Sequence, residues 1–114
     1  KRPDDGQLAY TIGEMENAFS GASMALDHMI RNAETNQPSP ETTNRAMIAR
    51  TLVGQNAIRT VERAMEVAGG ASFYRDFGLE RAFRDVQGAR YHPLQEKAQL
   101  RYTGRLALGA DIDG

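Results

Sequence analysis

Two histidines are the side chains of this sequence best suited to acid–base chemistry near neutral pH. His28 has no second histidine three or four residues away with which to share a metal ion, so we interpret it as a structural or solvent-facing residue. His92 directly precedes Pro93, which biases the backbone of His92 toward an extended conformation. A side chain at the joint between two helices can project into a cleft and act as a catalytic group. It can also cap a helix or pack against its neighbours, and both interpretations stay open.

A pair of glycines, Gly69 and Gly70, lies between a long helical pattern and a loop over residues 71–78 that carries three aromatic side chains. Glycine accepts the positive φ that ends many helices, and it also lets the backbone approach a ligand closely. The spacing therefore allows a helix cap, a ligand contact or both.

Arginines give the last third of the chain a local basic excess, at Arg81, Arg84, Arg90, Arg101 and Arg105. Ion pairs with Glu80 and Asp85, which lie within one helical turn of the first two arginines, explain part of this excess. The alternative is that the arginines contact a pyrophosphate or a partner subunit.

Composition excludes several other chemistries. The 114 residues contain no cysteine, so disulfides, cysteine-ligated zinc, iron–sulfur clusters and thiol nucleophiles are absent. No Glu-x-x-His pattern of a di-iron bundle occurs, and no metal site is expected. The chain has 14 lysines and arginines and 15 acidic residues, which gives a net charge of −1. This near balance does not indicate binding to a nucleic acid or an anionic membrane.

Apolar residues recur in alternating steps of four and three from Leu8 to Ala33, which predicts a first helix with one buried stripe, made of Leu8, Ile12, Met15, Phe19, Ala22, Leu26, Met29 and Ala33. Residues 36–40, with two prolines, end it. Ser39 is the predicted N-cap and Pro40 the first residue of a second helix, which runs to the Gly69–Gly70 pair.

A shorter helix is predicted over residues 79–90, and a last one from Leu94 to Leu108. Because no segment shows sustained alternation with a period of two, we expect an all-α chain, an up-and-down four-helix bundle forming a single domain over residues 1–114. No run approaches the roughly 18 apolar residues of a membrane span, and no signal peptide is visible, so the expected location is cytoplasmic. The start at Lys1 without a methionine predicts a piece of a longer protein.

Four segments in order resemble the C-terminal helical domain of the acyl-CoA dehydrogenase family, and the resemblance covers the chain from Leu8 to Gly109. They are residues 64–74 with the Gly-Gly pair and aromatic loop, residues 79–85 with Glu-Arg-x-x-Arg-Asp, residues 92–97, and residues 105–109. The resemblance implies the family's bundle without its opening long helix, in a larger flavoenzyme with an N-terminal helical domain and a middle β domain. Apolar surface is then expected to be exposed where the missing parts belong.

The implied function is the α,β-dehydrogenation of an acyl-CoA thioester by FAD in fatty acid metabolism, in a homo-oligomer, dimer or tetramer, with FAD near the subunit interface. By resemblance, Gly69 and Gly70 approach the adenosine part of FAD, and Glu66 stands where many members have a glutamine. Pro93 occupies the position of the usual catalytic glutamate, so the resemblance assigns no base, and His92 is the candidate catalytic residue.

Two alternatives remain beside the dehydrogenase. Some reduced-flavin-dependent monooxygenases of the same fold also place a histidine at the position of His92. A non-catalytic helical interaction module is the second. Whether the whole protein is a dehydrogenase or a monooxygenase, we expect this chain alone to be inactive, because most of the catalytic machinery lies in other domains.

Overall fold

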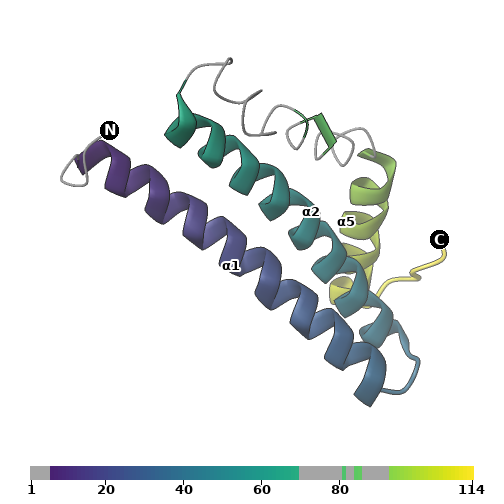
Figure 1. Ribbon diagram of the computed structural model, residues 1–114. Coiled ribbons are helices and arrows are strands. Elements are labelled where there is room, and N and C mark those ends of the chain that lie inside the picture. The colour runs from purple at the N-terminus through teal and green to yellow at the C-terminus, as the bar shows by residue number, and fades with distance from the viewer. Residues whose placement is uncertain (1–5, 70–80, 82–83, 86–92) are drawn as a thin grey trace.

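The computed structural model describes residues 6–69, 81, 84–85 and 93–114, and within them every regular element is an α-helix. The helices are α1, Gly6–Thr35, α2, Pro40–Ala68, and α5, Pro93–Leu108 (Figure 1). The all-α prediction is thus confirmed for these residues. The helix predicted over 79–90 falls almost wholly outside the described residues, so the four-helix bundle stays a prediction; Arg81, Arg84 and Asp85 are helical.

The turn between α1 and α2 follows the sequence signals. Ser39 has an extended backbone, with φ −165° and ψ 165°, and its side-chain Oγ accepts a hydrogen bond of 3.1 Å from the Thr42 N–H. Pro40 begins α2, where its missing N–H costs no helical hydrogen bond. The predicted N-cap and helix start are therefore confirmed.

Small and polar side chains of α1 form the contact with α2. Thr11, Ala18, Ala25 and Asn32 lie seven residues apart and are all buried, and Ala49 of α2 is buried as well. Such side chains allow two helix backbones to approach closely, and a seven-residue repeat keeps one face toward the neighbouring helix. At Gly21 an added Cβ would lie 3.2 Å from Nδ2 of Asn56, which shows how tight this contact is.

The predicted buried stripe of α1 is wrong. Ile12, Phe19 and Leu26 keep 37%, 58% and 43% of their surface exposed, and none of the eight stripe residues is buried. Buried residues of α1 directly precede the exposed Ile12, Phe19 and Leu26, about 100° away around the helix. The half-buried members of the predicted stripe are Leu8, Met15, Ala22 and Met29. The large side chains stay outside because no described element covers them, which agrees with the expectation of exposed apolar surface.

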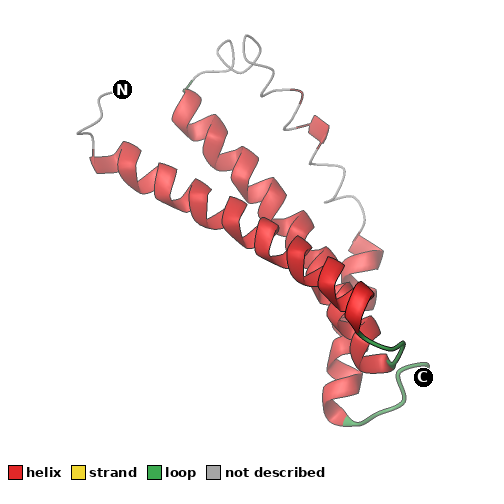
Figure 2. Ribbon diagram, turned by 60° about the horizontal axis from the view of Figure 1, so that its bottom comes forward, coloured by secondary structure: helices red, strands yellow, loops and turns green. Residues whose placement is uncertain are grey.

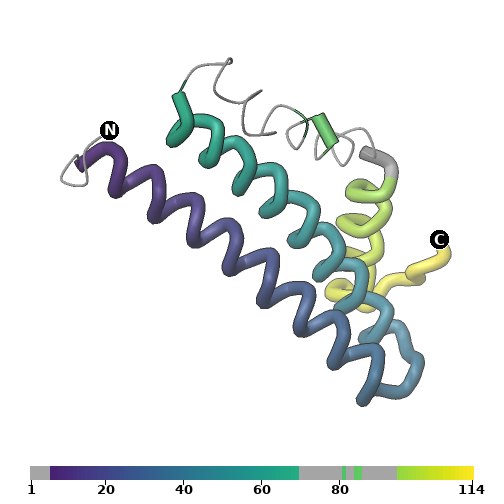
Figure 3. The backbone as a smooth tube through the Cα atoms, in the orientation of Figure 1, coloured from purple at the N-terminus to yellow at the C-terminus, as the bar shows by residue number. Residues whose placement is uncertain are grey.

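The third helix, α5, packs antiparallel against the half of α2 that begins at Pro40 (Figures 2 and 3). Its contacts are polar: Thr103 Oγ1 lies 2.5 Å from Asn44 Oδ1, and the Tyr102 hydroxyl donates to the Pro40 carbonyl at 3.4 Å. The result is an elongated molecule of 53 × 26 × 24 Å, in which α2 is the central helix. None of the helices described is long and apolar enough to cross a membrane.

The close contact at Gly21 leads to a stability prediction. Gly21→Leu places a large side chain against Asn56 and forces α1 and α2 apart, so it should destabilise the chain by about 1–3 kcal/mol. Gly13→Leu, on the same helix with nothing within 4 Å of its added Cβ, is the matched control and should leave stability equal or raise it. Urea unfolding followed by circular dichroism measures both, and equal effects of the two substitutions would contradict the close helix contact.

Candidate functional site

Of the residues predicted to form a site, Glu66 and Gly69 lie in the described structure, at the C-terminal end of α2. Gly70 and His92 lie outside the described residues. His28 is exposed on α1, as expected for a solvent-facing residue. Among the described residues no group of three histidine or acidic side chains is placed to hold a metal ion.

Glu66 is engaged with an arginine of its own helix. Its Oε1 accepts a hydrogen bond of 2.8 Å from Nη1 of Arg63, and the Glu66 side chain remains 54% exposed. The Nε of the same arginine lies 3.7 Å from Oε1 of Glu14 on α1. Arg63 therefore links two carboxylates and joins the two helices near the end of α2.

This Glu14–Arg63–Glu66 cluster borders a polar groove of about 380 Å³ between α1 and α2, lined by Glu14, Asn17, Ala18, Asn56, Arg59 and Arg63. The Nε of Arg63 is buried and makes no hydrogen bond, since its distance to Glu14 is too long for one. Sequence reasoning missed this groove. The i,i+3 spacing of Arg63 and Glu66 was readable, whereas the approach of Glu14 depends on how α1 aligns with α2.

Gly69 closes α2 in a conformation that favours glycine. Its φ is 101° and its ψ −122°, and its N–H donates to the Met65 carbonyl at 3.1 Å. The predicted cap is therefore confirmed. A Cβ added to Gly69 would meet no atom of the described residues within 4 Å, so none of their side chains covers the backbone here.

The charges at this end of α2 decide which part of FAD the described residues fit. A helix C-terminus carries a partial negative charge, and Glu66 adds a carboxylate one turn earlier. Both repel a pyrophosphate, but a carboxylate accepts hydrogen bonds from an adenine amino group or a ribose hydroxyl. The described residues at this end of α2 therefore offer hydrogen-bond acceptors, which would suit the adenosine part of FAD.

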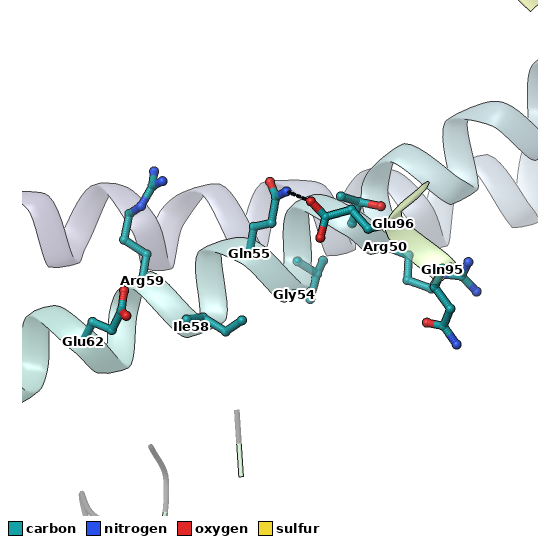
Figure 4. A pocket seen from close by; sticks show the side chains of 10 residues that line it. Arg50, Gly54, Gln55, Ile58, Arg59, Glu62, Gln95 and Glu96 are labelled. Atoms are coloured by element: carbon teal, nitrogen blue, oxygen red, sulfur yellow. Dashed lines mark hydrogen bonds between the residues drawn. The ribbon is translucent and has the colours of Figure 1, made fainter. Parts of the chain in front are cut away.

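A larger groove of about 620 Å³ lies between α2 and the start of α5 (Figure 4), lined by Arg50, Thr51, Val53, Gly54, Gln55, Ile58, Arg59, Glu62, Gln95 and Glu96. Gln55 and Glu96 point toward one another across it, and the Gln55 amide donates to the carboxylate at 2.9 Å. Its lining mixes both charges with amides, so it offers no single chemistry.

Two of the five arginines in the last third of the chain contact residues 111–114. Arg101 donates from Nη2 to the Gly114 carbonyl, and Arg105 donates from Nη1 to the Asp111 carbonyl at 3.0 Å. One N–H of each guanidinium thus meets a backbone oxygen, and contact of these arginines with an anion stays a prediction. Arg81 and Arg84 are exposed, and Arg90 lies outside the described residues.

Comparison with known proteins identifies the family. The family model described as "Acyl-CoA dehydrogenase, C-terminal domain" matches residues 1–96. The chain belongs to this family. It is also 29% identical over 88 residues to the Bacillus subtilis (strain 168) protein named "Putative acyl-CoA dehydrogenase YdbM". That match covers 77% of this chain and 23% of the relative, so the chain spans less than a quarter of the relative's length. No solved structure matches.

Membership of the acyl-CoA dehydrogenase family confirms the resemblance drawn from the Gly-Gly pair and the segments after it.

The cap at Gly69 gives a prediction that tests the local geometry. Gly69→Ala places a Cβ on a backbone with a φ of 101°, so it should destabilise the chain by about 1–3 kcal/mol. Gly104→Ala, within α5 and with open space around its added Cβ, should instead stabilise by up to about 1 kcal/mol. Thermal unfolding compares the two variants. A neutral Gly69→Ala would show that the end of α2 adopts another conformation.

Proposed function

We propose that this chain is the C-terminal helical part of an FAD-dependent acyl-CoA dehydrogenase-like oxidoreductase that introduces an α,β double bond into an acyl-CoA thioester. The observation that carries the proposal is the family match over residues 1–96, most of the chain. The relative named as an acyl-CoA dehydrogenase supports the same reaction class. The chain alone is not expected to turn over, because most of the catalytic machinery of such an enzyme lies in its other domains.

In this proposal, Glu66 and Gly69 are the described residues that contact FAD. The Glu66 carboxylate accepts a hydrogen bond from the adenosine part, while Arg63 on its other side holds the carboxylate in place. The open backbone at Gly69 lets a flat ring approach without meeting a side chain. FAD, when bound, supplies the acceptor of the hydride, and residues outside these helices bind its phosphates.

Assembly into a homo-oligomer and a cytoplasmic location complete the proposal. The exposed apolar side chains of α1 support association, since apolar faces of this kind mark contact surfaces. Acyl-CoA is the proposed substrate, and neither a nucleic acid nor a membrane is a proposed partner.

The test uses the whole protein that carries this sequence. Purified under native conditions, it should show the absorption of oxidised flavin, and a panel of acyl-CoA thioesters added without oxygen should bleach that absorption. The bleaching reports hydride transfer to the flavin, and product analysis should find the α,β-unsaturated thioester. A protein that binds no flavin would contradict the proposal. Oxygenated product formed only with reduced flavin and oxygen would replace it with the monooxygenase.

His92 is the proposed catalytic side chain, because Pro93 cannot exchange a proton at the position of the usual glutamate. In the whole protein, His92→Ala should lower turnover by about 100-fold or more, the size of a lost acid–base contribution, with flavin content unchanged. His28→Ala, which removes the exposed histidine of α1, is the control and should leave turnover unaltered. Equal turnover in the two variants would assign His92 to packing or capping.

A further inference from the structure

A third groove, which we call the turn groove, lies between α1 and α2 beside the turn that joins them (Figure 1). Its volume is about 430 Å³, which is within the range of small-molecule sites. Met29 and Ala33 of α1 line one side, Ala46 and Met47 of α2 line the other, and Pro38 lines it at the turn. None of these five side chains carries a charge or a hydrogen-bond donor, so the body of the groove is apolar.

The polar groups near the turn are already paired within the chain. The Asn32 amide donates to the Thr42 carbonyl at 3.0 Å and accepts from the Asn36 amide at 2.7 Å. Arg50 lies eight residues beyond Thr42 on α2, about 12 Å along the helix axis, and both residues line the groove. The turn groove is therefore elongated, with paired amides at one end and an arginine at the other.

Arg50 supplies the charge of the turn groove, whose described lining contains no acidic side chain. The Arg50 guanidinium makes no hydrogen bond or ion pair with a residue that the structure describes. Arg50 also borders the larger groove beside α5 (Figure 4), where Glu96 accepts a hydrogen bond of 2.9 Å from Gln55. The positive charge of Arg50 is thus available to an anion.

The chemistry of the ligand follows from this arrangement. A guanidinium binds a carboxylate through two parallel N–H···O bonds. Methionine side chains, as at Met29 and Met47, are flexible and adapt to an apolar body. A second charge on the ligand would enter the apolar part of the groove, where no group pairs with it. A length of about 12 Å accepts a chain of about eight carbons, since an extended chain rises roughly 1.2 Å per bond.

We propose that the turn groove binds a small monocarboxylate with an extended apolar body, its carboxylate on Arg50 and its body between Met29 and Met47. This ligand differs from the proposed substrate, because a thioester has no carboxylate. The groove is also separate from the proposed flavin site, since Glu66 lies 16 residues beyond Arg50 on α2, about 24 Å along the axis. Failure of the flavin proposal and failure of this site are therefore separate results.

The first experiment titrates the whole protein that carries this sequence with octanoate and follows the methionine methyl groups by ¹³C NMR. The signals of Met29 and Met47 should shift, with a dissociation constant below about 1 mM. Those of Met15, Met24 and Met65, which do not line the groove, should stay in place. Replacement of each methionine by leucine assigns the signals. No shift of Met29 and Met47 at about 10 mM octanoate would overturn the proposal, as would shifts confined to the other three.

Substitution of Arg50 tests the contact with the carboxylate. Arg50→Gln should weaken octanoate binding by about 10-fold to 100-fold, the size of a lost charge-assisted contact. Arg45→Gln removes an exposed arginine of the same helix that does not line the groove, so it is the control and should leave the affinity unchanged. Octanol and octylamine, which lack the negative charge, should bind at least about 10-fold more weakly than octanoate. Equal affinity of the two variants for octanoate would overturn the proposal.

Filling the groove tests the position of the apolar body. Ala33→Leu enlarges an exposed side chain of the groove and should weaken octanoate binding by about 10-fold or more. Ala9→Leu, at an exposed alanine of the same helix outside the groove, is the control and should have no effect. Both substitutions keep a strong helix former, and circular dichroism checks that the helices remain. Unchanged octanoate affinity in Ala33→Leu would show that the body of the ligand lies elsewhere and would contradict the site.

Discussion

The close contact between α1 and α2 is the constraint on which the rest of the structure depends. Thr11, Ala18, Ala25 and Asn32 face α2 at intervals of seven residues and keep the two backbones near each other. Asn32 fixes the alignment, because its buried amide donates to the Thr42 carbonyl at 3.0 Å and its Oδ1 accepts from the Asn36 amide. A slip of one turn would leave this amide unpaired, and a buried unpaired polar group costs about 1–3 kcal/mol. The same alignment brings Glu14 of α1 to Arg63 of α2.

That constraint also explains why the large apolar residues of α1 are exposed. A helix surface that contacts its neighbour through alanine and glycine has no room there for Phe19 or Leu26, so these side chains project from an adjacent face. Burying a side chain of this size is worth about 1.5–3 kcal/mol, so leaving several exposed withholds a large share of a small domain's stability. A partner or a further helix that covered this face would recover that free energy.

The ends of the helices could be predicted from the sequence because local chemistry determines them. Ser39 and Pro40 specify a helix start, and Gly69 specifies an end, whatever the helix packs against. The buried face of α1 could not be predicted in the same way. A pattern of apolar residues shows that a helix has an apolar face, but it does not show which element covers that face. The repeat that is actually buried combines alanine with Thr11 and Asn32, so a search for apolar residues passes over it.

The candidate site, like the fold, combines features set by a single residue with features set by the packing of two helices. Glycine at position 69 was predictable, because a positive φ is a property of one residue. The pairing of Glu66 with Arg63 was half predictable, from their spacing on one helix, while the approach of Glu14 was set by the alignment of two helices. Charge counting did not predict that Arg101 and Arg105 of α5 each donate to a carbonyl within residues 111–114, because these contacts depend on how the chain turns after α5.

The electrostatics at the end of α2 follow from these contacts. Arg63 donates to Glu66 at 2.8 Å and lies 3.7 Å from Glu14, so it offsets the charge of Glu66 first, and the carbonyl end of the helix remains as a negative group beside Gly69. Such a helix end accepts hydrogen-bond donors. In the proposed flavin site, this end of α2 would therefore offer acceptors to the adenosine part, and the cations that hold the phosphates would come from other residues.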